Sequence, residues 1–169
     1  LVWNCYKVGC SASGGTRVHL TVDDIKKGFK GSTDVPQEAF DLPEYVVSRS
    51  GGLYMNRWCA RWGIDAEELG LMYDVKEDRA VFPVVHDGKM VDATGRTLGK
   101  RIPKWKRYGN SGLPYVSGHG KVAVVVEDCV SAAVVGYGSF VGVALLGTSL
   151  SDTHKRYLTQ FSTAVIALD

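Results

Sequence analysis

Residues 122–126 read VAVVV, residues 141–146 read VGVALL and residues 164–168 read AVIAL. Continuous apolar runs of this length are typical of strands that are buried on both faces of a parallel sheet. Between them, residues 128–138 favour a helix that ends at a glycine, and residues 149–161 favour a helix opened by Ser and Thr caps. The sequence therefore predicts a β-α-β-α-β succession with right-handed crossovers, forming a parallel sheet covered on both faces.

A β-hairpin is predicted before this sheet. Residues 80–85 (AVFPVV) and residues 89–93 (KMVDA) flank the dipeptide Asp87-Gly88. Asp-Gly between two such stretches is the strongest short-range signal for a hairpin turn. We therefore expect an antiparallel pair of strands around residues 87 and 88.

Helical segments are predicted upstream of the hairpin. Residues 51–63 favour a helix that stops at a glycine. Asp65, followed by a glutamate three positions later, matches a capping box, so we expect a second, short helix over residues 65–69 that ends at Gly70.

The first fifty residues carry weaker signals. Residues 1–15 combine aromatic and β-branched residues with a Gly/Ser-rich exit, which predicts a short hairpin or knuckle. Residues 16–50 are expected to be a connector with one or two helical turns over residues 21–28.

The composition excludes several classes of protein. The 169 residues are 45% hydrophobic and 22% charged, which excludes disorder, and no apolar run is long enough to span a membrane. The net charge of +2 by itself indicates no nucleic-acid partner. Cys59 and Cys129 lie in settings typical of reduced, buried thiols, so we expect a cytoplasmic protein without a membrane partner. The chain begins at Leu1 and ends at Asp169 directly after an apolar run, and we expect it to be an excised piece.

Two carboxylates follow predicted strands. Glu127 comes directly after residues 122–126 and Asp169 directly after residues 164–168. In a flavodoxin-like strand order these strands are neighbours, so the two carboxylates meet at the carboxyl edge of the sheet. Like charges so placed repel unless a divalent cation lies between them, and Mg²⁺ prefers carboxylate, water and phosphate oxygens. Alternatively, Glu127 is a solvated residue near a helix N-cap and Asp169 a simple strand end.

A cationic stripe lies between the hairpin and the parallel sheet. Residues 96–121 contain no acidic residue, and Trp105 and Tyr108 are interleaved with the cations. The seven basic residues of the stripe are Arg96, Lys100, Arg101, Lys104, Lys106, Arg107 and Lys121. Cations neutralise phosphates and aromatic faces accept stacked bases, so the stripe indicates single-stranded nucleic acid or nucleotides. Alternatively, it is a solvated basic loop.

Two cysteines near the start fit half of a metal site. Cys5 and Cys10 are separated by four residues and suit one knuckle of a zinc ribbon. Tetrahedral zinc needs four ligands, so we interpret the pair as the second half of a ribbon whose first half lies upstream.

The motifs resemble, in order, those of a known family. Residues 124–132 (VVVEDCVSA), 145–151 (LLGTSLS) and 165–169 (VIALD) look like the TOPRIM fold of bacterial-type DNA primases. The resemblance is closest to the primases of bacteriophages, which are often joined to a replicative helicase. Upstream, residues 80–84 (AVFPV) and 103–105 (PKW) are similar to the stretch that precedes TOPRIM in these enzymes.

The resemblance implies an α+β fold. This is a mixed α/β primase core, in which a β-hairpin subdomain is followed by a TOPRIM-like parallel βαβαβ sheet and preceded by a partial zinc-ribbon remnant. The domains it implies are residues 1–15 as a partial zinc ribbon, 16–50 as a connector, 51–120 as the N-terminal subdomain with the basic hairpin region, and 121–169 as the truncated first part of TOPRIM.

The resemblance also assigns roles to residues. Glu127 matches the metal-site glutamate and Asp169 the first aspartate of an Asp-x-Asp pair, so both are expected to be catalytic and to bind Mg²⁺ or Mn²⁺. The second aspartate would follow Asp169, so the fragment is expected to be catalytically incomplete. Zn²⁺ is expected on Cys5 and Cys10 in the intact parent protein. The residues expected to bind template or nucleotide phosphates are Arg96, Lys100, Lys104, Trp105 and Lys106.

The function implied is that of a DNA-dependent RNA primase, a nucleotidyltransferase that makes short RNA primers for replication. Its expected partners are a single-stranded DNA template, ribonucleoside triphosphates and a replicative helicase in the same chain or in another, in the cytoplasm of a bacterium or of an infected host cell. Two alternatives remain open, since TOPRIM enzymes share their metal site across opposite reactions. One is a TOPRIM nuclease or topoisomerase, and the other is a non-catalytic module that binds single-stranded nucleic acid.

Overall fold

The computed structural model describes residues 2–4, 13–15, 40–48, 52–147 and 149–168. The chain divides into two compact units, Leu1–Val35 and Pro36–Leu168. In the first unit, β1 (Val2–Asn4) pairs antiparallel with β2 (Ser13–Gly15), which confirms the hairpin predicted there. Cys5, Cys10 and the predicted helical turns of the connector lie outside the described residues.

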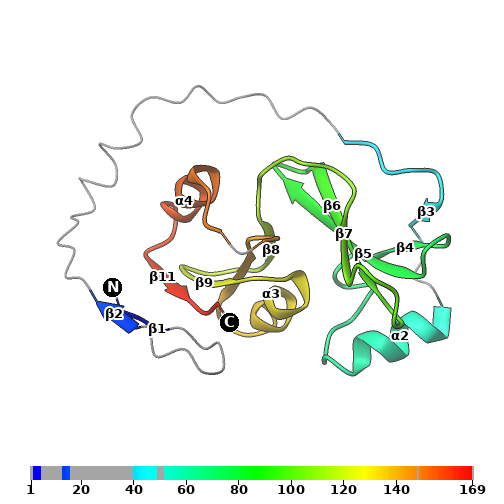
Figure 1. The fold of residues 1–169 in the computed structure, drawn as a ribbon, viewed down its shortest axis with the longest axis horizontal. Helices are drawn as coiled ribbons and strands as arrows, with labels where there is room; N and C mark the ends of the chain where they lie inside the picture. Colours follow the sequence, from blue (N-terminus) through cyan, green and yellow to red (C-terminus); the bar gives the residue numbers. More distant parts are fainter. Residues whose placement is uncertain (1, 5–12, 16–39, 49–51, 148, 169) are drawn as a thin grey trace. The chain divides into compact units, whose positions relative to one another are not determined.

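The second unit begins with a five-stranded antiparallel sheet (Figure 1). Its strands, in spatial as well as chain order, are β3 (Val46–Val47), β4 (Met72–Asp74), β5 (Arg79–His86), β6 (Lys89–Thr97) and β7 (Trp105–Arg107). The predicted hairpin is confirmed as β5 and β6. Asp87 and Gly88 turn the chain with φ of 51° and 73°, a backbone conformation that a two-residue hairpin turn requires.

Of the two helices predicted upstream of the hairpin, the first is confirmed, and the prediction of the second is wrong. Helix α2 (Gly52–Ala60) forms, and its chain then turns at Gly63. Residues 66–70 make only turns, although the Asp65 carboxylate accepts the backbone N–H groups of Glu67 and Glu68 at 2.8 and 2.9 Å, as an N-cap does. Gly70, at a φ of 60°, ends the segment before a helix can propagate.

The second sheet has four strands in the order β11-β9-β10-β8. Strands β9 (Val122–Val126), β10 (Val141–Ala144) and β11 (Thr163–Ile166) are parallel, which confirms the predicted core of this sheet and the adjacency of its first and third strands. Strand β8 (Tyr115–Gly118) was not predicted, and it pairs antiparallel with β10. The sheet is therefore mixed rather than purely parallel.

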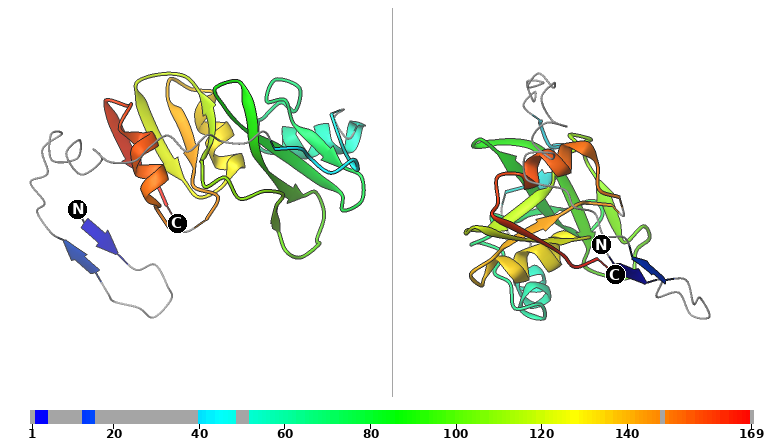
Figure 2. Two further views of the ribbon diagram at one scale, coloured as in Figure 1. Left: turned by 90° about the horizontal axis from the view of Figure 1, so that it is seen from above. Right: turned by 90° about the vertical axis from the view of Figure 1, so that its left-hand side faces the viewer.

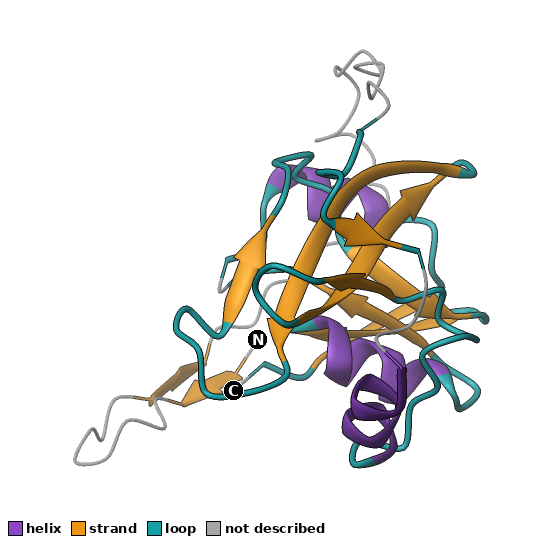
Figure 3. Cartoon of the chain, turned by 90° about the vertical axis from the view of Figure 1, so that its right-hand side faces the viewer, coloured by secondary structure: helices purple, strands orange, loops and turns teal. Residues whose placement is uncertain are grey.

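Helices cover both faces of this second sheet, as predicted. Helix α3 (Cys129–Gly136) and helix α4 (Asp152–Leu158) lie on opposite sides of the strands in Figures 1 and 3, and both are shorter than predicted. Helix α3 approaches β10 closely at Gly142, where an added Cβ would lie 2.0 Å from the carbonyl oxygen of Ala132. Any larger residue at position 142 would push the helix off the sheet.

The two sheets of the second unit share one hydrophobic core. Phe82 on β5 is completely buried, and its ring lies 6.0 Å from that of Trp105 and 5.6 Å from that of Tyr115. The same cluster includes Val126 and Val130, from the second sheet and its helix. Strands β5, β7, β8 and the end of β9 therefore contribute to a common core rather than to separate domains.

Two further expectations concern the state of the cysteines and the absence of a membrane span. Cys59 and Cys129 are free, buried thiols, which confirms the prediction for them. Burial raises the pKa of Cys59 to about 11 and that of Cys129 well above its ordinary value, so neither is a reactive thiolate at neutral pH. Within the part of the chain that the structure describes, no helix is long and apolar enough to cross a membrane.

Candidate functional site

Glu127 lies at the carboxyl edge of the second sheet. It follows β9 directly and is half-buried, and its backbone oxygen accepts the N–H group of Leu146 at 3.2 Å. The next residue, Asp128, caps helix α3 by accepting the N–H group of Ser131 at 3.0 Å. The carboxylate of Asp128 is thus committed to the helix, which leaves Glu127 as the carboxylate at the strand end.

The strand that leads to Asp169 lies next to β9. Strand β11 pairs with β9 up to Ile166 opposite Val125, and the N–H group of Ala167 donates to the carbonyl of Val125 at 2.9 Å. The backbone therefore runs toward the same edge as Glu127. Asp169 itself lies outside the described residues, so the predicted meeting of the two carboxylates stays a prediction.

The described residues offer one carboxylate, Glu127, for a divalent cation at this edge. Among them, no three Asp, Glu, His or Cys side chains gather into a metal site. Mg²⁺ is often held by one or two carboxylates together with water and substrate phosphates, so the chemistry of Glu127 fits this cation. Any further protein ligands would lie outside the described residues, as Asp169 does.

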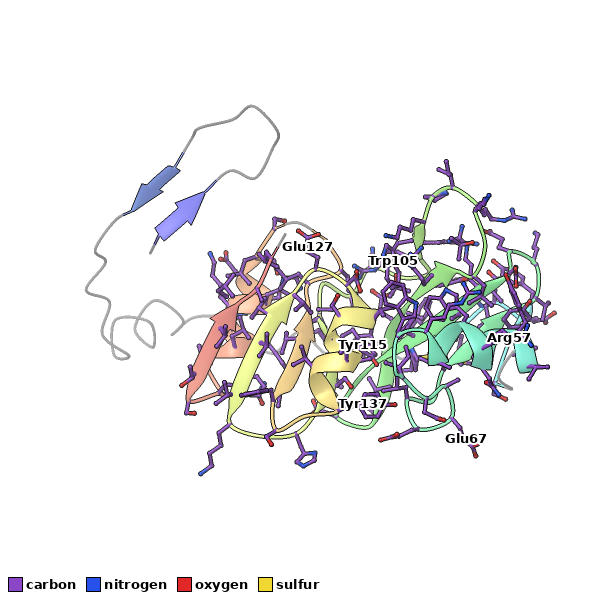
Figure 4. All side chains as sticks on the ribbon, turned by 90° about the horizontal axis from the view of Figure 1, so that it is seen from below. Arg57, Glu67, Trp105, Tyr115, Glu127 and Tyr137 are labelled. Atoms are coloured by element: carbon purple, nitrogen blue, oxygen red, sulfur yellow. The ribbon has the colours of Figure 1, made fainter. Side chains whose placement is uncertain are left out.

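Arg96 connects the cationic stripe to the Glu127 edge. It lies on β6 opposite Trp105 on β7, and its guanidinium carbon is 5.6 Å from the centroid of the Trp105 ring. Burial lowers the pKa of Arg96, and the charge of nearby Asp128 acts in the opposite direction. Arg96 thus lies against Trp105, whose place in the unit can be compared with that of the predicted metal-site glutamate, Glu127. Figure 4 shows Trp105 and Glu127 toward one edge of the unit and Tyr137 and Glu67 toward the other.

Three cations of the stripe project from the loop between β6 and β7. Lys100, Arg101 and Lys104 are exposed, and no ion pair recorded within the described residues involves any of them. Figure 2 (left) shows this loop as a green segment that extends from the sheet. These three side chains are therefore open to solvent.

Two other cations of the stripe are already paired. The ammonium group of Lys106 forms an ion pair with Glu77, and the guanidinium of Arg107 forms one with the buried carboxylate of Asp92. Their acidic partners are 29 and 15 residues away in the sequence. Although residues 96–121 contain no acid, acids from other segments neutralise two of their cations. Lys106 is therefore a weaker candidate for phosphate binding than Lys100 or Lys104.

Glu77 provides a test of this pairing. Hydrogen bonds from Lys106 and Arg79 lower the pKa of its carboxyl. The pairing therefore stabilises the fold above the unfolded-state pKa, about 4.3, and is lost as the pH falls through the lower folded-state value. We expect Glu77→Gln to lower the free energy of unfolding at pH 7, and the difference from the unmodified protein to shrink toward about pH 3. Urea unfolding of both proteins at pH 7 and at about pH 3 measures this difference in the free energy of unfolding. The exposed Glu67→Gln is the control, and an equal loss at both pH values would contradict the pairing.

Arg79 is a residue that sequence reasoning missed. Its side chain is fully buried at the start of β5. It donates to the carbonyl oxygens of Pro103 at 3.0 Å and of Gly95 and Lys104 at 3.4 Å, and to the Glu77 carboxylate at 3.0 Å. One guanidinium group thus holds both ends of the basic loop. An arginine at the start of an apolar strand is the signal that could have found it.

A cavity of about 440 Å³ lies away from this edge. It is at the opposite end of helix α3 from Glu127, and Tyr137, which lines it, accepts the N–H group of Asp65 at 2.7 Å. Its lining includes Glu68, Tyr115, Ser117, His119 and Gly136. The cavity therefore does not belong to the region formed by Glu127, Arg96 and the basic loop.

Comparison with known proteins identifies the fold of the chain. No protein-family model matches the sequence, and no curated protein matches it. Among solved structures, the chain is similar to the zinc-binding and RNA polymerase domains of the Aquifex aeolicus primase, with a TM-score of 0.56, 17% identity, and coverage of 70% of this chain and 43% of that one. It is also similar to the DnaG primase catalytic domain bound to single-stranded DNA, with a TM-score of 0.54, 15% identity, and coverage of 72% and 56%.

A third structure, described as the DnaG catalytic core, gives a TM-score of 0.51 at 16% identity and covers 71% of this chain and 55% of that one. These likenesses establish that the chain has the mixed α/β fold of the catalytic core of bacterial-type primases. The chain spans about half the length of the structures that it matches.

Proposed function

We propose that this chain is part of a DNA-dependent RNA primase, which joins ribonucleotides on a single-stranded DNA template. The observation that carries the proposal is that Arg96 lies against Trp105, which is toward the same edge of the unit as Glu127 (Figure 4). The primase-core fold supports it. Charges that bind phosphates beside a carboxylate that can hold a divalent cation suit phosphoryl-group transfer.

In this mechanism the chain's own residues position the strands. Lys100, Arg101 and Lys104 would neutralise template phosphates, and Arg96 would bind a phosphate nearer to Glu127. Trp105 is half-buried against Phe82 and lies under Arg96, so we assign it to orienting that guanidinium rather than to stacking a base.

Glu127 would hold Mg²⁺ or Mn²⁺ together with Asp169 and further acids. When bound, the cation lowers the charge on the triphosphate and activates the attacking hydroxyl. A zinc ribbon completed around Cys5 and Cys10, and a replicative helicase in the same chain or another, belong to the same proposal, as does a cytoplasmic site of action.

The test is a primer-synthesis assay with the full-length protein, single-stranded DNA, labelled ribonucleoside triphosphates and Mg²⁺. Short, template-dependent RNA products are expected. Metal-dependent cleavage of the strand without synthesis would instead support a TOPRIM nuclease, and strand binding with neither activity would support a non-catalytic binding module.

The basic loop gives a prediction that does not depend on catalysis. Replacing Lys100, Arg101 and Lys104 together with alanine is expected to weaken single-strand binding. It should also flatten the dependence of log Kobs on log salt by about 2, since each neutralised phosphate of a single strand contributes roughly 0.7. Titration by fluorescence anisotropy at several salt concentrations measures both effects.

The control for the triple variant is Arg57→Ala, which removes an exposed cation on helix α2 outside the stripe. Its affinity and salt dependence should match those of the unmodified protein. A triple variant with unchanged affinity and slope would remove the basic loop from the binding surface.

A further inference from the structure

Ile102 is the most unusual apolar residue of the second unit. Its side chain is 89% exposed, more than any other large hydrophobic residue recorded as exposed in the described part of the chain. By contrast Leu98, at the start of the same loop, is buried and belongs to the core. The loop therefore buries one aliphatic side chain and leaves the other in water, where it contributes nothing to the fold.

Exposed cations flank Ile102 on both sides. Lys100 and Arg101 precede it and Lys104 follows it, and all three are exposed. Single exposed apolar residues are common and need no explanation by themselves. An aliphatic side chain framed by three cations is different, because the cations would attract a polyanion to the position where that side chain projects.

The base of the loop is fixed, so its end is presented in a defined position. The N–H group of Thr97 donates to the carbonyl of Lys104 at 3.1 Å, and that of Leu98 donates to the carbonyl of Asp78 at 3.0 Å. The buried Arg79 adds bonds to Gly95, Pro103 and Lys104. A loop held at both ends loses less conformational entropy on binding than a free one.

We propose that Ile102 is an apolar wedge that packs against the unpaired bases of a nucleic-acid strand, while the flanking cations hold the phosphates on either side of the contacted base. Base faces are apolar, and aliphatic side chains inserted at base steps unstack them in other nucleic-acid-binding proteins. The proposal deepens the proposed function, on which it rests for the presence of a bound strand. It adds that the loop displaces stacked bases rather than only attracting phosphates.

The test compares Ile102→Ser with Val85→Ser in binding to single-stranded DNA that carries 2-aminopurine, whose fluorescence rises when it is unstacked. Val85 is half-exposed and lies near the Asp87-Gly88 turn, at the other end of β5 from Arg79. Because Ile102 makes so little contact with the fold, Ile102→Ser should keep its stability, which thermal unfolding checks.

With the unmodified protein and with Val85→Ser, we expect 2-aminopurine fluorescence to rise on binding. With Ile102→Ser, the rise should be lost and the affinity should fall about five- to tenfold, at the lower end of the range for losing one base contact. The salt dependence should stay the same, since no charge is removed.

Three results would overturn the wedge. The first is an Ile102→Ser variant with unchanged affinity and fluorescence, the second is a loss of affinity with a flatter salt dependence, and the third is no strand binding by the unmodified protein. The first two leave the proposed function standing. If the wedge is observed but primer synthesis is absent, the proposed function fails while the inference holds.

Discussion

Replacing Glu127 with glutamine is expected to abolish primer synthesis and to leave strand binding intact or stronger. The substitution keeps the volume and removes the charge of the carboxylate at the end of β9. A metal ion contributes several kcal/mol of transition-state stabilisation to phosphoryl transfer, so losing its protein ligand should reduce the rate by about a thousandfold or more. Binding should be unharmed because a negative charge near the bound phosphates is removed.

The measurement is primer synthesis by the full-length protein, together with strand binding by anisotropy in the same buffer. Glu67→Gln is the matched control, since it makes the same change on an exposed carboxylate toward the other edge of the unit (Figure 4). A Glu127→Gln variant that synthesises primers at the normal rate would refute the metal-site role. Equal loss in both variants would point to a general effect on the protein.

Replacing Arg79 with methionine is expected to lower the free energy of unfolding by about 3 kcal/mol, since each buried carbonyl left without its donor costs roughly 1–3 kcal/mol. Methionine keeps much of the side-chain volume, but it removes the donor to the carbonyls of Gly95 and Pro103 and one of the two cations that bond Glu77. Urea unfolding measures the effect. Arg57→Met on helix α2 is the control and should change stability little, because its side chain is exposed.

Measuring strand binding as well shows whether Arg79 positions the basic loop or only stabilises the fold. A folded Arg79→Met variant should bind a single strand more weakly than the unmodified protein, because the basic loop has lost the group that fixes its ends. The single variant Glu77→Gln, which removes the ion pair but keeps Arg79 on the loop carbonyls, should bind the strand nearly as well as the unmodified protein. An equal loss of binding in Glu77→Gln and Arg79→Met would mean that Arg79 acts only through its ion pair with Glu77.

Local patterns explain which parts of the fold the sequence predicts. The apolar runs of β9 and β10 and the Asp87-Gly88 turn are encoded by neighbouring residues, so they are readable without a structure. Strand β8 is short and only partly buried, and its partner β10 follows more than twenty residues later, so no local signal announces it. The predicted helix over residues 65–69 failed because capping alone cannot sustain one turn.

In the candidate site, too, some features have a local sequence signal and others depend on the three-dimensional fold. Glu127 was found because a carboxylate directly after a buried strand has a defined place at the sheet edge. The pairing of Lys106 with Glu77 and of Arg107 with Asp92 depends on strands meeting in three dimensions, so the charge run overstated the free cations. Arg79 itself is visible in the sequence at the start of an apolar strand, but its partners are backbone carbonyls, so the sequence does not show which segments it anchors.

The common core around Phe82 has a consequence for protein engineering. Tyr115, on the strand that borders β10, packs against Phe82 of the other sheet, and helix α3 belongs to the same cluster. A chimera that exchanged residues 121–168 for those of another protein would separate β10 from its neighbour and expose apolar surface on both halves. Exchanging residues 115–168 instead would keep β8 and β10 together. The residue that replaces Tyr115 would then have to pack against Phe82.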